Sequence, residues 1–186
     1  MNRFTISETP LAGLKVIERQ RLIDTRGFLT RIFCAKELAA VGWNRPIAQI
    51  NHTSTADQGT IRGMHFQHPP HCEMKLVSCL RGEVWDVAVD IRAGSPTFLH
   101  WFGAHLSADN CRALLIPEGF AHGFQTLTDT VELLYCHSAA YAAGAEGGLN
   151  PRDPQLAIDW PLPVTEISAR DLSHPLIHND FQGVCP

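Results

Sequence analysis

Side chains that could carry out chemistry are concentrated between residues 61 and 75, in the segment IRGMHFQHPPHCEMK. This segment combines histidines with two fixed cations, Arg62 and Lys75. An unperturbed imidazole titrates at about 6.5, so a histidine can act as a general base near neutral pH. Arginine and lysine suit a phosphate group or a developing oxyanion. The segment therefore supplies candidates both for a base and for anion recognition.

His65 is the strongest candidate base, because it lies inside an apolar strand between Met64 and Phe66. A lone histidine in a strand is also commonly a hydrogen-bonded core residue, and the local sequence leaves that alternative open. Strand alternation places Arg62 and His65 on opposite faces, unless Gly63 allows a bulge that turns one of them. The two residues can share a site only in the second case.

His122 and Tyr135 are further candidates, each with a structural alternative. His122 shares a strand face with Phe120 and Phe124, an arrangement typical either of an aromatic-walled pocket or of a packed core. Tyr135 ends an apolar strand, and its alternative is a core tyrosine with its hydroxyl at the mouth of a barrel.

A metal site is another use for clustered histidines. Small jelly-roll barrels of the cupin type bind a divalent ion with clustered histidines, a glutamate shortly after them and one distant histidine, a set that His65, His71, Glu73 and His122 could mimic. The spacing disfavours this alternative, because His65 and His68 are three apart and face opposite sides of an extended strand. Pro69-Pro70 then ends the strand and places His71 in a loop. We expect no metal ligand, and we expect His68 and His71 to be solvated.

The elements that position these residues are mostly short strands. Helix signals are confined to residues 36–42, closed by Gly42, and to a turn at 168–172. Turn-forming Gly, Pro, Asn and Asp residues separate short apolar stretches at 28–34, 74–80, 83–91, 113–116, 120–127 and 131–136. Many short strands with little helix predict an all-β sandwich or barrel.

Strict alternation in the stretch 83–91 gives that strand two distinct faces. Trp85, Val87, Val89 and Ile91 share one face, and Val84, Asp86, Ala88 and Asp90 share the other. Acidic side chains beside alanine suit either a solvent-exposed face or a polar cavity inside a barrel. The sequence alone leaves both interpretations open.

Composition bounds the class of protein. The chain has 186 residues and 20.6 kDa, with 15 Lys+Arg against 19 Asp+Glu and a net charge of −4. We expect one domain over 1–186. The charge argues against a nucleic-acid binder that relies on a broad basic face. No run approaches the roughly 18 apolar residues of a membrane span. The start, MNRFTISETPLAGL, lacks the pattern of a signal peptide, and the six cysteines form no CxxC pair. We therefore expect a cytoplasmic protein with free thiols.

Two motifs of the chain are specific in combination, IRGMHFQ at 61–67 and IPEGFAHGF at 116–124. Supporting segments are DTRGF (24–28), AQINH (48–52), KLVSCLRGEVWDVAVDIR (75–92), SPTF (95–98), LSADN (106–110), LLY (133–135), YAAGAEGG (141–148) and SARD (168–171). Through these segments the chain resembles the dTDP-4-dehydrorhamnose 3,5-epimerase family. The resemblance runs in order from about residue 10 to residue 177, leaving a short C-terminal tail.

The resemblance implies a cupin-like jelly roll that forms a homodimer and needs no metal or organic cofactor. It implies a substrate that is a nucleotide-linked 4-keto-6-deoxy sugar, inverted at the carbons that flank the ketone. It also implies that an N-terminal segment reaches across the dimer to the partner's site. Such an enzyme would serve a pathway to a surface polysaccharide or a glycosylated product.

The family's site residues map onto this chain individually. The resemblance implies His65 as the base, Asp171 as the carboxylate that orients it, Tyr135 as the general acid and Lys75 as the cation beside the ketone. Arg170 stands where the family commonly has lysine. The implied contacts with the nucleotide sugar are Arg26, Gln49, Asn51, Arg62, His122 and Glu146.

Several positions depart from the family pattern without removing a catalytic residue. Arg31 replaces an acidic substrate contact, Ile50 replaces the aspartate of a Gln-Asp-Asn triplet, and Cys136, followed by His137, replaces a lysine. Pro151-Arg152-Asp153-Pro154 replaces a Trp-x-Asp-Pro pattern. These departures bear on the identity of the nucleotide and the sugar more than on the reaction.

We therefore expect a 3,5-epimerase acting on a nucleotide sugar such as dTDP-4-dehydro-6-deoxyglucose. One alternative keeps the fold but inverts only the 3-position, or uses a GDP- or CDP-linked sugar. A second is a metal-dependent cupin oxygenase or isomerase, for which stoichiometric metal would be found in the purified protein. A third is a catalytically silent nucleotide-sugar binding protein. The presence of both His65 and Tyr135 argues against this last class.

Overall fold

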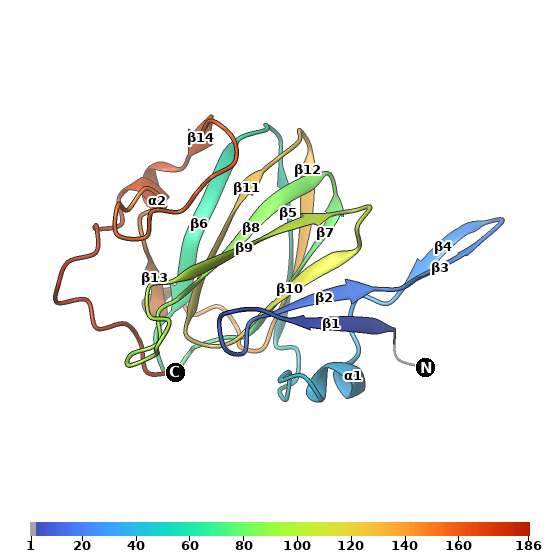
Figure 1. The fold of residues 1–186 in the computed structure, drawn as a ribbon, viewed down its shortest axis with the longest axis horizontal. Helices are drawn as coiled ribbons and strands as arrows, with labels where there is room; N and C mark the ends of the chain where they lie inside the picture. Colours follow the sequence, from blue (N-terminus) through green and yellow to red (C-terminus); the bar gives the residue numbers. More distant parts are fainter. Residues whose placement is uncertain (1–2) are drawn as a thin grey trace.

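Two facing β-sheets make up most of the computed structural model, which describes residues 3–186 (Figure 1). The first sheet contains, in spatial order, β1 (Phe4–Glu8), β2 (Lys15–Arg19), β10 (Arg112–Ile116), β7 (Lys75–Arg81), β12 (Val131–His137) and β5 (Gln49–Thr55). The second contains β13 (Glu146–Gly148), β6 (Thr60–Gln67), β11 (Phe120–Thr126), β8 (Glu83–Asp90) and β9 (Trp101–Ser107), and β14 (Glu166–Ile167) pairs with β6 in parallel. The all-β jelly roll expected from the sequence is confirmed.

The main core fills the space between the two sheets. Inward-facing apolar side chains of β7, β10 and β12 meet those of β8, β9 and β11, and the members include Val77, Leu114, Leu133, Ala88 and Phe124. Strand alternation supplies this arrangement, because every second residue of each strand points into the sandwich. The core occupies one part of the interior, and the space around His65, His122 and Tyr135 is left for polar side chains.

A second apolar cluster covers the outer face of the first sheet. It includes Leu76 and Leu115 of the sheet together with Leu38 of the short helix α1 (Ala35–Ala39) and Trp43, which follows that helix. The expected strand over 28–34 is wrong beyond Thr30, where β4 ends. Residues 31–34 lead instead into α1, where the ring of Phe33 packs edge-on against Trp43 with 5.4 Å between ring centroids.

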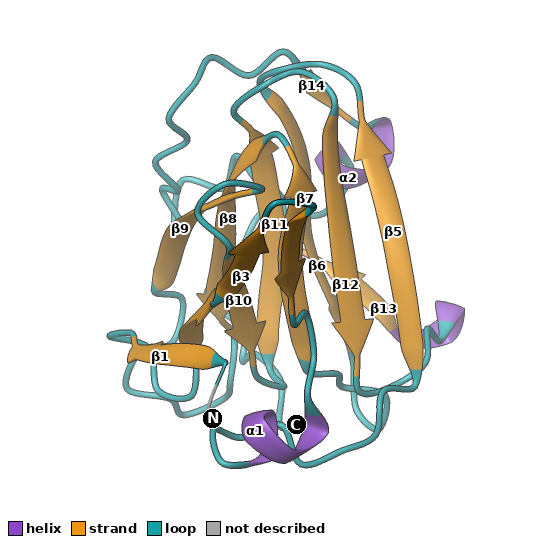
Figure 2. Ribbon diagram, turned by 90° about the vertical axis from the view of Figure 1, so that its right-hand side faces the viewer, coloured by secondary structure: helices purple, strands orange, loops and turns teal. Residues whose placement is uncertain are grey.

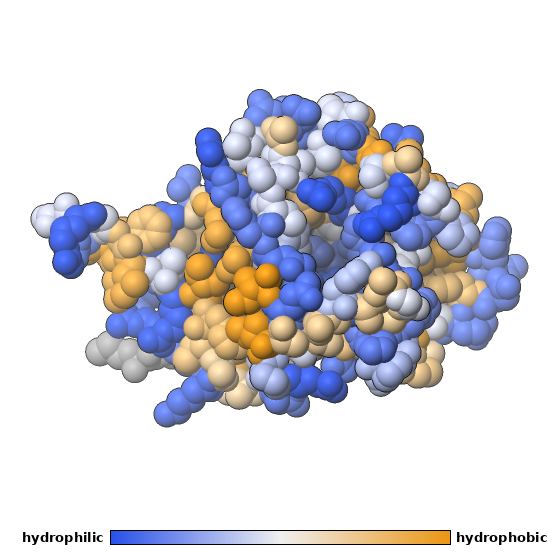
Figure 3. Space-filling view, turned by 180° about the vertical axis from the view of Figure 1, so that it is seen from behind, coloured by the Kyte–Doolittle hydropathy of each residue, from blue (hydrophilic) through white to orange (hydrophobic). Residues whose placement is uncertain are grey.

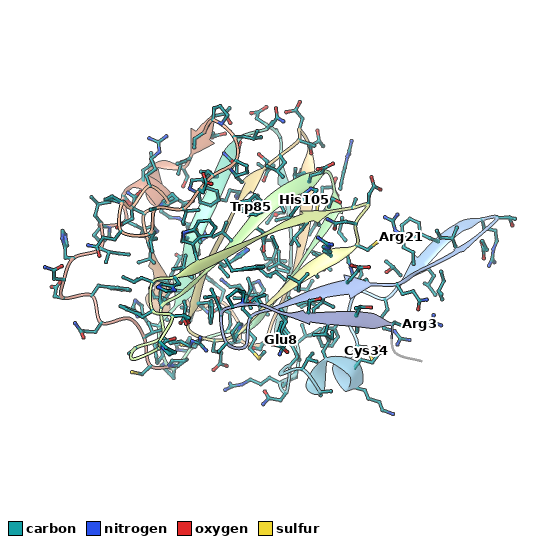
Figure 4. The ribbon with its side chains drawn as sticks, viewed as in Figure 1. Arg3, Glu8, Arg21, Cys34, Trp85 and His105 are labelled. Atoms are coloured by element: carbon teal, nitrogen blue, oxygen red, sulfur yellow. The ribbon has the colours of Figure 1, made fainter. Side chains whose placement is uncertain are left out.

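A two-stranded hairpin of β3 (Arg21–Asp24) and β4 (Gly27–Thr30) projects from the body of the molecule (Figure 1). Arg21 lies at its base in Figure 4, with its guanidinium 4.4 Å from the centre of the Phe28 ring. Ile23, Phe28 and Leu29 are 77%, 59% and 68% exposed. The hairpin, at the left edge of Figure 3, thus presents apolar side chains that this chain does not cover.

The second sheet resolves which way the acidic face of β8 points. Figure 2 shows β8 between β11 and β9, and Asp86 and Asp90 are fully buried. Trp85 faces the other way, opposite His105 of β9 (Figure 4). Asp86 therefore lies in the polar interior of the barrel.

Among the described residues, no helix is long and apolar enough to cross a membrane.

Candidate active site

A pocket of about 250 Å³ opens between the two sheets. Its walls come from inward-facing residues of β5, β6, β7, β11 and β12, from Glu73 just before β7, from the segment that follows β12 and from Arg170. They are Gln49, Asn51, Thr53, Arg62, His65, Phe66, Gln67, Glu73, Lys75, His122, Phe124, Tyr135, His137, Ala139, Tyr141, Glu146 and Arg170. Nine of the eleven predicted site residues line this pocket, and the other two are Asp171 and Arg26.

Asp171 lies directly behind the predicted base. Its Oδ1 is 2.8 Å from Nε2 of His65, and its Oδ2 accepts a hydrogen bond of 3.1 Å from the backbone N–H of Gly63. The short helix α2 (Ala169–Leu172) carries Asp171, and the Ser168 side chain caps that helix by accepting from the Asp171 N–H. Contacts with β6 and with the cap of its own helix thus fix the position of the Asp171 carboxylate behind His65.

The pKa of Asp171 lies well below its usual range. Burial alone would raise the pKa of this carboxyl, but the hydrogen bonds from His65 and from the Gly63 amide outweigh burial. Asp171 is therefore ionised at neutral pH. A buried carboxylate in contact with an imidazole N–H stabilises the imidazolium that forms when the ring takes a second proton.

The geometry identifies the basic nitrogen of His65. Nη2 of Arg170 lies 3.2 Å from Nε2, but a guanidinium can only donate hydrogen bonds. Nε2 cannot both accept from Arg170 and donate to Asp171, and the shorter contact to a charged acceptor favours donation to Asp171. Nδ1 therefore carries the free lone pair that can take a proton from a ligand.

A bulge at Gly63 brings Arg62 and His65 into the same pocket, the second of the two cases left open by the sequence. His122 of β11 pairs with His65 of β6, whereas Phe124 pairs with Arg62, so β6 uses one more residue than its partner over this stretch. Gly63 has φ +133°, and a Cβ there would lie 2.5 Å from the Cα of Gly123. Only glycine fits this close approach of the two strands.

Lys75 is a buried residue of the pocket wall. Its Nζ lies 3.1 Å from Oε1 of Glu73 and donates a hydrogen bond of 3.2 Å to the backbone carbonyl of His65. Glu73 also accepts from Nε2 of Gln67 at 2.9 Å. The ammonium group is thus held close to the base, and part of its charge is balanced by the neighbouring carboxylate.

Tyr135 reaches the pocket from the opposite sheet to His65. It lies on β12 of the first sheet and is 9% exposed, and His65 lies on β6 of the second. The pKa of Tyr135 is raised well above its usual value, first by burial and then by the nearby charge of Asp86. The phenol is therefore protonated at neutral pH and can donate a proton.

His122 packs edge-on against Tyr135, with 5.9 Å between ring centroids, and its Nε2 lies 2.8 Å from Oδ1 of Asp86. Both members of this pair are buried. Sequence reasoning missed Asp86 as the partner of His122. The alternation of β8 grouped Asp86 with Asp90 but did not say whether that face pointed inward.

The predicted polar contacts form the rim of the pocket. Gln49 donates to Asn51 at 2.9 Å, and Arg170 pairs with Glu146 at 3.2 Å. Tyr141 also lines this rim and donates to Glu146 at 3.0 Å. Tyr141 and His137 are pocket residues that sequence reasoning did not assign to the site, although His137 stood out there as following a departure from the family pattern.

Arg26 is the predicted contact that the structure does not bring to the pocket of its own chain. It lies at the turn of the β3–β4 hairpin, its side chain is 87% exposed, and it pairs with Asp24 at 2.6 Å. The pocket walls contain no residue of the hairpin.

The four residues weighed as a metal set do not gather around one point. His122 contacts Asp86, Glu73 contacts Lys75, and His71 is exposed in the loop after β6, as expected. Within residues 3–186, the side chains close enough to share an ion are His65, Asp171 and His174, whose ligand atoms lie within 4.8 Å of one another. The guanidinium of Arg170 lies against two of these three side chains.

The arrangement can move protons on both sides of a bound ring. His65 with Asp171 can supply a base on one wall, Tyr135 can supply an acid on the facing wall, and Lys75 can supply positive charge close to His65. Such a set suits proton abstraction next to a carbonyl, because removing that proton builds negative charge on the carbonyl oxygen.

Comparison with known proteins agrees with this chemistry. The family model for dTDP-4-dehydrorhamnose 3,5-epimerase matches residues 8–179. A dTDP-4-dehydrorhamnose 3,5-epimerase of Salmonella typhimurium is 40% identical over 92% of this chain and 94% of its own length. A dTDP-4-dehydrorhamnose 3-epimerase of Streptomyces niveus is 39% identical over 87% of this chain and 78% of its own.

A solved structure extends the agreement to three dimensions. The dTDP-6-deoxy-D-glucose-3,5-epimerase of Legionella pneumophila, in complex with dTDP-4-keto-L-rhamnose, superposes with a TM-score of 0.90. It is 39% identical and covers 98% of this chain and 99% of its own. The sequence match and the shared fold show that the chain belongs to the dTDP-4-dehydrorhamnose 3,5-epimerase family.

Proposed function

We propose that this protein is an epimerase that inverts C3 and C5 of a nucleotide-linked 4-keto-6-deoxyhexose such as dTDP-4-dehydro-6-deoxyglucose. The observation that carries the proposal is the placement of the His65–Asp171 pair and Tyr135 on opposite sheets across a single pocket. Inversion needs a proton removed from one face of the sugar and another delivered to the opposite face. The two walls of the pocket supply these two groups.

The reaction proceeds through an enolate. Nδ1 of His65 takes the proton next to the ketone, the electrons of the C–H bond move onto the ketone oxygen, and Asp171 stabilises the imidazolium. Lys75 stabilises the oxygen where the negative charge develops. Tyr135 then protonates the carbon from the other face. Before the next inversion the imidazolium gives its extra proton to water and the phenolate takes one from water, which the raised pKa of Tyr135 favours. The same steps apply at C3 and at C5.

Charge at the pocket supports a diphosphate-linked ligand. Arg62 and Arg170 both line the pocket, and an arginine fork matches the oxygens of a phosphate. The relatives named dTDP-4-dehydrorhamnose 3,5-epimerase support a dTDP-linked sugar as the substrate. Because that name refers to a rhamnose precursor, it also supports a role in rhamnose and polysaccharide biosynthesis.

A 3-epimerase is the second candidate, because relatives with that narrower activity are almost equally similar. The Streptomyces niveus 3-epimerase is 39% identical, and a 3'-monoepimerase from Streptomyces bikiniensis is 34% identical with a TM-score of 0.84. The base, the acid and the cation proposed for the pocket would suit inversion at C3 alone as well as inversion at both C3 and C5.

Deuterium wash-in tests both candidates. The protein is incubated in deuterated water with a panel of dTDP-, GDP- and CDP-linked 4-keto-6-deoxy sugars, and label is followed at C3 and C5 by NMR. Label at both carbons of the dTDP sugar, with inverted product, supports the 3,5-epimerase. Label and inversion at C3 alone identify a 3-epimerase. Absence of label with every sugar contradicts the proposed chemistry.

We further propose a homodimer in which the β3–β4 hairpin reaches the partner's pocket. The hairpin exposes Ile23, Phe28 and Leu29, and such exposed apolar side chains are typical of a surface that a partner covers. Arg26 at its turn lies outside the pocket of its own chain, which suits a contact made with the substrate of the other subunit. The six free cysteines suit the reducing cytoplasm, where we place the enzyme.

A further inference from the structure

His137 is a pocket residue to which the mechanism above gives no task. It ends β12, where its cross-strand partners are Lys75 of β7 and Gln49 of β5, so the three side chains stand in one row on the inner face of the first sheet. Its ring also stacks on Tyr135, with 6.0 Å between ring centroids and 21° between the ring planes. His137 therefore lies next to both the ammonium group and the acid.

A directional chain of hydrogen bonds fixes the tautomer of this ring. The backbone N–H of Tyr141 donates to Oε1 of Gln49 at 2.9 Å, so the amide nitrogen of Gln49 faces Asn51 and donates to its Oδ1 at 2.9 Å. The amide nitrogen of Asn51 then faces Nε2 of His137 at 3.4 Å. An amide N–H can only donate, so Nε2 must accept and the proton of the neutral ring lies on Nδ1.

The surroundings keep His137 neutral. Burial lowers its pKa to about 4, with further lowering by the positive charge of Lys75 and by His122. A proton on Nε2 would in addition point at the amide hydrogens of Asn51. No other hydrogen bond to this ring occurs within residues 3–186, so Nδ1–H is left to bind a ligand in the pocket.

A second hydrogen-bond donor at the ketone would add to the stabilisation that Lys75 provides. Its ammonium group is shared with the carboxylate of Glu73 and the carbonyl of His65, so its charge is only partly available to a ligand. A neutral imidazole beside it can donate a hydrogen bond to the enolate oxygen while it keeps its own proton, as neutral histidines do in other enzymes that enolise a carbonyl.

We propose that His137 is a further catalytic residue that donates its Nδ1–H to the ketone oxygen of the substrate, beside Lys75. This inference rests on the proposed function. It adds no proton transfer, since the hydrogen stays on Nδ1 while negative charge builds on the oxygen and leaves it again. The Tyr141–Gln49–Asn51 chain positions the ring by holding it in the tautomer that can donate.

The tautomer is tested without substrate. In ¹⁵N-labelled protein at pH 7, long-range proton–nitrogen spectra distinguish protonated from unprotonated ring nitrogens, and the His137 signals are those missing from His137→Asn. We expect Nδ1 to be protonated and Nε2 to be free. A ring protonated at Nε2, or a mixture of tautomers, would overturn the directional chain and the proposal with it.

The catalytic role is tested by paired substitutions. His137→Phe keeps a planar ring against Tyr135 but removes the donor, and should lower kcat for wash-in by about 10², the lower end of the range for one oxyanion donor, with KM changed less than about threefold. His137→Asn places an amide near the Nδ1 position and should recover at least tenfold of that loss. Should His137→Phe fail to fold, as judged by its thermal transition, His137→Leu takes its place.

The outcomes separate this inference from the proposed function. Absence of wash-in by the unmodified protein refutes the proposed function. Wash-in by the unmodified protein at a rate that His137→Phe leaves unchanged refutes only the role of His137. A rise in KM alone also refutes that role, because the donor would then bind a part of the ligand that does not react.

Discussion

Replacing Asp171 with asparagine should slow proton abstraction by about 10- to 10²-fold while leaving the fold in place. The carboxylate uses one oxygen for Nε2 of His65 at 2.8 Å and the other for the Gly63 N–H at 3.1 Å. An asparagine has only one oxygen to offer these two donors. The change is nearly isosteric, so the difference is chemical rather than steric.

Both orientations of the new amide impair the base. With its oxygen toward Gly63, its NH₂ group faces Nε2 of His65, which forces the ring proton onto Nδ1 and blocks the nitrogen that must act. With its oxygen toward His65, the imidazolium loses its charged partner, and a hydrogen bond to a charged group is worth about 1.5–3 kcal/mol. A loss of about 1.5–3 kcal/mol, at about 1.4 kcal/mol per factor of ten, gives the range stated.

The assay is deuterium wash-in under single-turnover conditions, with circular dichroism at pH 7 as the control for folding.

The same variant should also change how the free energy of unfolding depends on pH. Because the pKa of Asp171 is lowered in the folded state, its contribution to stability is present above the unfolded pKa of about 3.9 and is lost as the pH falls further. Unfolding free energy should thus fall less steeply below about pH 4 in Asp171→Asn. A folded variant with unchanged wash-in would refute the dyad.

Three further tests address the acid, the dimer and the bulge. Tyr135→Phe should still exchange deuterium into unepimerised substrate while inversion slows by about 10² or more, whereas His65→Asn should abolish both, and equal loss of exchange in the two variants would contradict the separate roles. Equal mixtures of Arg26→Ala and His65→Ala subunits should regain up to about a quarter of the activity, since about half the dimers become mixed and each has one intact site, and no recovery after proven subunit exchange would exclude the shared site. Gly63→Ala should lower the unfolding temperature sharply because its Cβ would lie 2.5 Å from Gly123, whereas Gly144→Ala, with nothing within 4 Å, should have little effect on that temperature, and equal effects would contradict the packing of the bulge.

Local patterns in the sequence predicted the elements better than the contacts between them. Alternation and turn residues identified β7, β8, β10, β11 and β12 to within one or two residues, because those signals depend on neighbours along the chain. The same reasoning extended the strand that begins at Phe28 too far. It ends at Thr30 because the next side chains pack on α1 and Trp43, which the local pattern does not contain.

In the candidate site too, local sequence signals were predictable and contacts between distant segments were not. The sequence marked Gly63 as the residue that could bring Arg62 and His65 together, since only glycine allows the close strand approach that the bulge needs. The pairing of His65 with Asp171 came from the family resemblance alone, because 106 residues separate the two in the chain. The partner of His122 could not be predicted, since the side of the sheet on which Asp86 lies depends on how the two sheets pack.

An unusual residue on the first sheet can contact a substrate in the pocket only if its side chain lies on the inner face of that sheet. Ile50 and Cys136, two departures from the family pattern, are cross-strand partners and share a face. That face is the outer one, because Cys136 belongs to the cluster under α1 and neither residue lines the pocket. Strand alternation then turns the next residue, His137, inward onto Lys75 and Tyr135. Of these three positions, His137 alone can contact a ligand in the pocket of its own chain.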